Sequence, residues 1–173
     1  MGLSVGVSVC VAHAWGAKNM ESVRRIVHTA MLTSVIAGGI VLFIGFFGCR
    51  TFLTWMGTPD NVIDQSTLYM RIYFLGMPFF LVYNFGAAIL RALGDTQRPL
   101  LYLSLAGVLN VLLNLFFVLV LKMDVAGVAL ATIASQCLSA VLIVRCLMTS
   151  DGSYKLELKK LKIHPRKFRR ILQ

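Results

Sequence analysis

The chain has 173 residues, of which 58% are hydrophobic and 14% are charged, and its mean hydropathy is +0.79. This composition is far more apolar than the core of a soluble domain of this size requires, so it excludes an ordinary soluble globular protein. The net charge of +10 would suggest nucleic-acid binding in a soluble protein, but eight of the 17 Lys and Arg residues lie between Lys155 and Gln173. The charge is therefore a local feature, and we expect no nucleic-acid partner.

The chain opens on an apolar stretch, residues 2–15, that is too short to cross a bilayer. A membrane-spanning helix needs about 20 residues, because each residue adds about 1.5 Å to a hydrocarbon core of about 30 Å. We interpret this stretch as a helix whose beginning is missing.

Four longer windows contain no Asp, Glu, Lys or Arg: residues 26–49, 72–90, 99–121 and 125–144. Each is long enough to span, so the sequence predicts an all-α, polytopic transmembrane helix bundle. Pro78 lies within the second window, where it removes one backbone hydrogen bond and predicts a kink.

The orientation follows from the Lys and Arg residues, which are in excess in cytoplasmic connections. If the basic tail is cytoplasmic, 14 Lys and Arg residues fall on its side and only three, Arg50, Arg71 and Lys122, on the other. We therefore expect a multi-pass protein of the cell membrane, in contact with lipid, with its tail in the cytoplasm.

The last window carries small residues at every fourth position, Gly127, Ala131, Ser135 and Ser139, which predict close helix packing. The four cysteines have no paired spacing, so neither a disulfide framework nor a metal site is indicated. Among the windows there is no nucleophile with an acid–base partner, so we expect no enzyme and no bound cofactor.

Uncharged polar residues inside two neighbouring spans are the candidate site. Asn110 and Asn114 share one helical face, and so do Thr132 and Gln136 in the next span. Amide and hydroxyl oxygens can coordinate a small hard cation or orient a carboxylate that does so. Hydrogen bonding between helices is the alternative, and it is the commoner use of such amides.

Three connecting segments carry a family resemblance: Ala12-His-Ala-Trp-Gly-Ala-Lys-Asn19, Leu90-Arg-Ala-Leu-Gly-Asp-Thr-Gln-Arg-Pro99 and Asp124-Val-Ala-Gly-Val-Ala-Leu-Ala-Thr132. In this order and spacing they resemble the multidrug and toxic compound extrusion family of secondary transporters. The family has twelve transmembrane helices in two lobes of six, and this chain resembles helices two to six. Residues 1–150 then correspond to a partial amino-terminal lobe, and residues 151–173 to a basic cytoplasmic connection toward a second lobe.

The resemblance implies a cation site built by an acidic residue on helix one, polar residues on helix five and a threonine on helix six. Asn110, Asn114 and Thr132 fall at the matching places, although some members carry Asp where this chain has Asn114. The implied function is a cation-coupled antiporter, using Na⁺ or H⁺, that exports small organic and often cationic compounds. A related lipid-linked oligosaccharide flippase or polysaccharide exporter, and a non-transporting membrane scaffold subunit, are the alternatives.

Overall fold

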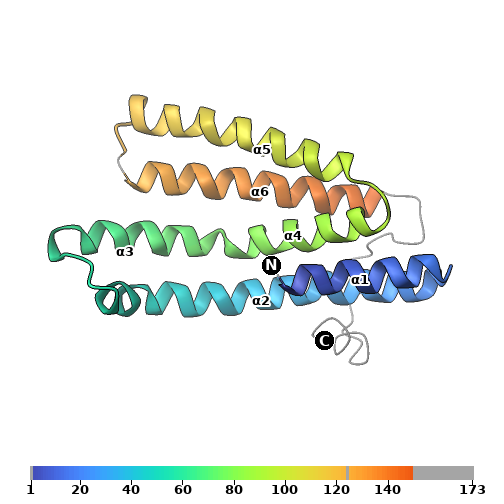
Figure 1. The fold of residues 1–173 in the computed structure, drawn as a ribbon. Coiled ribbons are helices and arrows are strands. Elements are labelled where there is room, and N and C mark those ends of the chain that lie inside the picture. Colours follow the sequence, from blue (N-terminus) through green and yellow to red (C-terminus); the bar gives the residue numbers. More distant parts are fainter. Residues whose placement is uncertain (1, 124, 150–173) are drawn as a thin grey trace.

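The structure, a computed structural model, describes residues 2–123 and 125–149, and within these ranges it is a bundle of helices without strands. The elements in chain order are α1 (Gly2–Gly16), α2 (Met20–Trp55), α3 (Asp60–Leu75), α4 (Met77–Ala92), α5 (Gln97–Leu115), the π-helical turn η1 (Phe116–Val120) and α6 (Val125–Thr149) (Figure 1). The expected all-α membrane bundle is confirmed. The basic tail at 151–173 lies outside the described residues.

Three of the helical segments are long and apolar enough to cross a membrane, namely α2, α5 with η1, and α6. The helix α2 extends beyond the predicted window 26–49 at both ends, for 36 residues in all. Its first turn is polar and is capped by Asn19, whose side chain accepts a hydrogen bond of 3.0 Å from the backbone amide of Ser22. This cap stabilises the first turns of α2. The predicted window leaves these turns out because they contain charged residues.

The second predicted span is a broken pair, in which α3 and α4 meet at Gly76 with a bend of 42°. The kink predicted from Pro78 is confirmed, since this proline lies in the first turn of α4, where a missing amide hydrogen is tolerated. The helical segment begins earlier than the predicted start at residue 72, at Asp60. Its first turns carry Asp60 and Asp64, and a window defined by the absence of charged residues excludes them.

The ends of the helices separate into two groups (Figure 1). The α1–α2 turn, the α4–α5 turn and the end of α6 lie at one end of the bundle, and the α2–α3 and α5–α6 turns lie at the other. The first end carries Lys18, Arg24, Arg25, Arg91, Arg98 and Arg145. The alternation from which the orientation was predicted is therefore present in the fold.

The tight α4–α5 turn has the residues that its geometry requires. Gly94 adopts a φ of 92°, in the left-handed region that favours glycine. The next residue, Asp95, accepts a hydrogen bond of 3.1 Å from the backbone amide of Arg98 and so satisfies one free donor at the start of α5. These two residues let the chain reverse its direction between α4 and α5.

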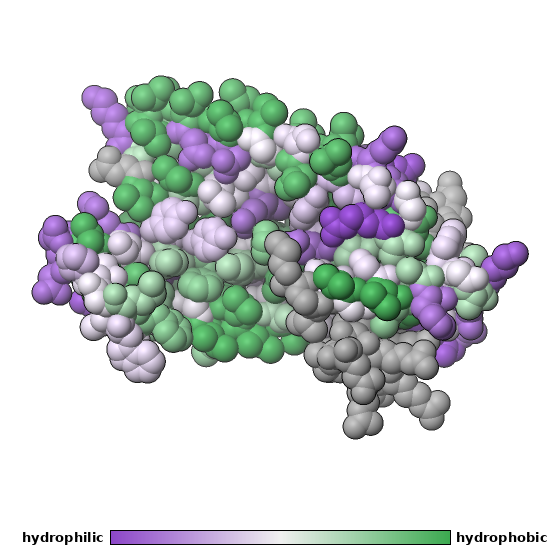
Figure 2. All heavy atoms as spheres, viewed as in Figure 1, coloured by the Kyte–Doolittle hydropathy of each residue, from purple (hydrophilic) through white to green (hydrophobic). Residues whose placement is uncertain are grey.

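The core lies among α1, α2, α4 and α6, and its largest fully buried side chains include Phe85, Ile89, Leu90, Ile143 and Leu147. The helix α5 packs mainly against α6 and leaves most of its apolar side chains exposed. Figure 2 shows hydrophilic residues gathered at the two ends of the bundle and hydrophobic ones along α5 and the outer side of α2. This is the distribution expected of a protein that lies across a bilayer.

Two glycines bring α2 into close contact with the broken pair. A Cβ atom added to Gly38 would lie 2.6 Å from the Cα of Pro78. At Gly45 an added Cβ would overlap the ring of Phe74. Because these positions lack side chains, the α2 backbone passes directly beside the break between α3 and α4.

Candidate functional site

A chain of hydrogen bonds crosses from α5 to α6 inside the bundle. The side-chain amide of Asn114 donates to Oδ1 of Asn110 over 3.0 Å. The amide of Asn110 donates to the hydroxyl of Ser135 over 3.2 Å, and that hydroxyl donates to the backbone carbonyl of Thr132 over 2.8 Å. The network links the two neighbouring spans in which the sequence predicted a polar face.

The direction of these bonds determines which atom is left without a partner. Ser135 has one hydroxyl hydrogen and gives it to a backbone carbonyl, so it must accept from the Nδ2 of Asn110. The Oδ1 of Asn110 then faces Asn114, which must present its own Nδ2 as the donor. The Oδ1 of Asn114 is consequently a buried acceptor with no hydrogen-bond partner among the described residues.

A buried oxygen of this kind is costly, since an unsatisfied acceptor loses its hydrogen bonds to water without replacement, at about 1–3 kcal/mol. Each such group in a folded protein calls for an explanation, such as a ligand or a partner from elsewhere. We therefore take the amide network around Asn110 and Asn114 as the candidate site.

The structure brings two of the three predicted site residues together and uses the third differently. Thr132 joins the network through its backbone carbonyl, while its side-chain hydroxyl donates to the backbone carbonyl of Val128 over 3.0 Å. Ser135 bridges the helices, and sequence reasoning had assigned it to the packing stripe. Ser135 stands three residues after Thr132, and this spacing could have placed it on the polar face of the same helix.

Gln136 was predicted to share the polar face with Thr132, and it does so only in part. Both residues line the cavity described below. However, the Oε1 of Gln136 lies 2.6 Å from the position of a Cβ added to Gly76, so its end faces the break between α3 and α4. The side chain thus reaches the kink, and no hydrogen bond to Asn110 or Asn114 is found for it among the described residues.

A cavity of about 480 Å³ lies beside the network, between α4, α5 and α6. Its polar lining residues are Tyr83, Asn84, Arg91, Asn110, Thr132, Ser135, Gln136 and Ser139. Apolar side chains complete the wall, among them Phe80, Leu103 and Ala106. This mixture of apolar wall and few polar groups is typical of a site for a small organic molecule.

The wall of this cavity is held by a hydrogen bond between α4 and the start of α5. The hydroxyl of Tyr83 is buried and donates to the backbone carbonyl of Pro99 over 2.8 Å. Because Pro99 lies in the first turn of α5, this bond ties α4 to the start of α5, at the end of the bundle that holds the α4–α5 turn. No carboxylate is among the residues that line the cavity.

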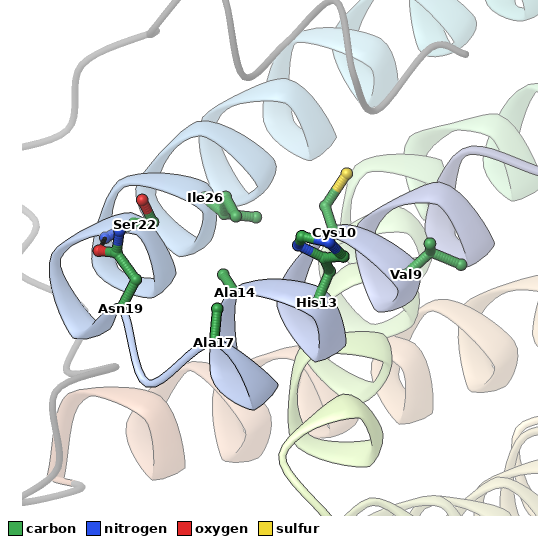
Figure 3. A pocket seen from close by; sticks show the side chains of 8 residues that line it. All are labelled: Val9, Cys10, His13, Ala14, Ala17, Asn19, Ser22 and Ile26. Atoms are coloured by element: carbon green, nitrogen blue, oxygen red, sulfur yellow. Dashed lines mark hydrogen bonds between the residues drawn. The ribbon is translucent and has the colours of Figure 1, made fainter.

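A second cavity, of about 490 Å³, lies at the turn between α1 and α2 (Figure 3). Cys10 and His13 come from α1, while Asn19 and Ser22 stand at the start of α2. Asn19 already caps α2. Within the described part of the chain no three His, Cys, Asp or Glu residues are placed to hold a metal ion. His28, on α2, is buried, and its Nδ1 is hydrogen-bonded to the backbone carbonyl of Arg24 over 2.8 Å.

Comparison with known proteins gives the family. The MatE family model matches residues 1–116. A probable multidrug resistance protein of Bacillus subtilis (strain 168), YoeA, is 34% identical over 139 residues, which is 78% of this chain and 30% of YoeA. A second one, YpnP of the same strain, is 41% identical over 92 residues, which is 53% of this chain and 21% of YpnP. The chain therefore spans less than a third of the length of these relatives.

Solved structures agree with this assignment. An inward-facing and an outward-facing structure of a multidrug resistance MATE family transporter each match with a TM-score of 0.91 and 26% identity. Both matches cover 99% of this chain, and 39% and 38% of the two solved chains. The fold, the apolar spans and these similarities together identify a membrane protein, and the chain belongs to the MatE family of multidrug transporters.

Proposed function

We propose that this chain forms most of one lobe of a cation-coupled antiporter that exports small organic, often cationic, compounds across the cell membrane. The proposal of cation coupling rests on the buried Oδ1 of Asn114, which has no hydrogen-bond partner among the described residues. Asn114 uses its side-chain amide nitrogen to donate to Asn110, so this oxygen remains available to a ligand. The cavity beside it supplies a place for an organic substrate.

The unpartnered oxygen is suited to two coupling ions. It can bind Na⁺ directly, or it can accept a hydrogen bond from a protonated carboxyl group. Neutral oxygens alone offset the dehydration of an ion poorly, so a carboxylate is needed near Asn114. The resemblance implies an acidic residue on helix one of the family, and we propose that Asn110 and Asn114 orient it.

The similarity to two transport states supports movement of whole lobes. The chain matches the inward-facing and the outward-facing transporter structures with the same TM-score, 0.91. A segment that kept one shape in both states would move as a rigid body, with the change of access occurring between it and a second lobe. The relatives named above favour neither an oligosaccharide flippase nor a scaffold.

The coupling is tested with the full-length protein in proteoliposomes loaded with a fluorescent cationic dye. An imposed H⁺ or Na⁺ gradient is expected to drive dye across the membrane against its own gradient. For one-to-one exchange, a difference of about one pH unit is worth about 1.4 kcal/mol and sustains roughly tenfold accumulation. Dye movement that is insensitive to both gradients, and to ionophores that dissipate them, would contradict the proposal.

The proposed orientation is tested by the accessibility of single cysteines. Lys18 lies in the α1–α2 turn and Lys122 in the α5–α6 turn, at opposite ends of the bundle. In a background without native cysteines, we expect Lys122→Cys in intact cells to react with a membrane-impermeant maleimide. Lys18→Cys is expected to react only after the membrane is made permeable. The reverse pattern would contradict the proposed orientation.

A further inference from the structure

We propose that an anionic phospholipid binds in a groove between α4 and α6, with its headgroup at Arg145 and one acyl chain along the groove. The groove has a volume of about 440 Å³. Its lining includes Phe79 and Val82 on α4, and Val141, Val144, Arg145 and Met148 on α6. The inference is independent of which substrate or coupling ion the protein uses.

The groove is distinct from the cavity at the amide network. On α6 that cavity is lined by Ser135 and Ser139, whereas the groove is lined by Val141 and Met148. At about 100° per residue these two sets lie on opposite sides of the helix. A molecule in the groove would therefore contact neither Asn110 nor Asn114.

The dimensions of the groove suit an acyl chain. Its α6 wall runs from Ala140 to Thr149, which is about 14 Å of helix. The headgroup would lie beside Arg145 and Thr149, so the wall from Ala140 to Arg145 follows about 8 Å of an acyl chain, roughly half of a leaflet about 15 Å thick. Val141 is 56% exposed and Phe79 37% exposed, so the groove is open at the side, toward the space that lipid occupies in a membrane.

The positive charge of Arg145 favours a lipid with an anionic headgroup. Arg145 is exposed and takes part in none of the ion pairs found within residues 2–123 and 125–149. The two described carboxylates at this end of the bundle are already paired, Glu21 with Arg25 and Asp95 with Arg98. The phosphate of a lipid is the counter-ion that the membrane itself supplies.

The headgroup would meet a second polar group besides the guanidinium. Thr149 also lines the groove and stands four residues after Arg145, on the same helical face. Its hydroxyl can donate to a phosphate oxygen while Arg145 donates through two nitrogens. A cation with an adjoining apolar groove between transmembrane helices is a recognised arrangement for anionic lipids.

The test is native mass spectrometry of the full-length protein, titrated with phosphatidylglycerol and, separately, with phosphatidylcholine. Arg145→Gln is expected to weaken phosphatidylglycerol binding about fivefold, as for the loss of one basic contact near a membrane surface, and to leave phosphatidylcholine binding unchanged. Val141→Trp fills the groove from its exposed side and is expected to reduce binding of both lipids.

Arg25→Gln is the matched control, because this arginine is at the same end of the bundle and is already paired with Glu21. It is expected to bind both lipids as the unmodified protein does. An equal loss of phosphatidylglycerol binding in Arg25→Gln and Arg145→Gln would show that only the general surface charge matters, and it would overturn the proposal. Unchanged phosphatidylglycerol binding in Val141→Trp would overturn it too, because the acyl chain would then lie elsewhere.

Discussion

Replacing Asn110 and Asn114 together by alanine in the full-length protein is expected to reduce dye efflux about ten- to a hundredfold. Losses of that size follow when the groups that orient an ion-binding ligand are removed. The double substitution deletes the unpartnered Oδ1 of Asn114 and the amide that holds Asn114 in place. Efflux of a fluorescent cationic dye is measured in cells, normalised to the amount of protein in the membrane.

The control is Thr33→Val, which replaces a buried hydroxyl of α2 by a methyl group. Thr33 is 7% exposed, and its hydroxyl donates to the backbone carbonyl of Thr29 over 2.7 Å. It lines neither the cavity nor the amide network. We expect its efflux to equal that of the unmodified protein. If the asparagine double variant also retained full efflux, the pair would serve only to pack α5 against α6.

Gly38→Ala is expected to destabilise the folded protein by about 3 kcal/mol, at the upper end of the range for overpacked interiors. The added Cβ would lie 2.6 Å from the Cα of Pro78, and a backbone atom cannot turn away as a side chain can. Relief requires α2 to move away from the break between α3 and α4. The measurement is unfolding of the full-length protein in detergent, followed by circular dichroism.

Gly39→Ala is the control for this prediction, because it makes the same chemical change one residue later. A Cβ added there meets no atom within 4 Å. Since alanine is a better helix former than glycine by about 0.5–1 kcal/mol, Gly39→Ala is expected to be neutral or slightly stabilising. Equal stability of the two variants would show that α2 does not approach the break as closely as the structure has it.

The spans were predictable because a helix that crosses a bilayer needs about 20 residues and rarely contains charged ones. Within the described residues, windows without charged residues located the three long apolar helices and the bent α3–α4 pair, and Pro78 located the kink to within two residues. The ends were less predictable. The first turns of α2 and α3 contain Glu21 and Asp60, so a search for apolar windows stops short of them although the helices continue.

The site was predictable in its helices but only partly in its contacts. The spacing of Asn110 and Asn114 placed both amides on one face, and the structure joins them by a hydrogen bond. Which α6 residue they meet depends on the rotation of α6 about its axis, and a spacing of four does not determine that rotation. In the structure Ser135, rather than the Thr132 side chain, meets the side chain of Asn110.

The contact between Gly38 and Pro78 lies near the middle of both elements that form it. Gly38 is midway along α2, and the break at Gly76 is midway along the α3–α4 pair. At about 1.5 Å per residue, α2 is about 54 Å long, so its ends extend beyond a core of about 30 Å on both sides. α2 packs on α4 with one half of its length and on α3 with the other, so a displacement at the Gly38–Pro78 contact would loosen both packings at once.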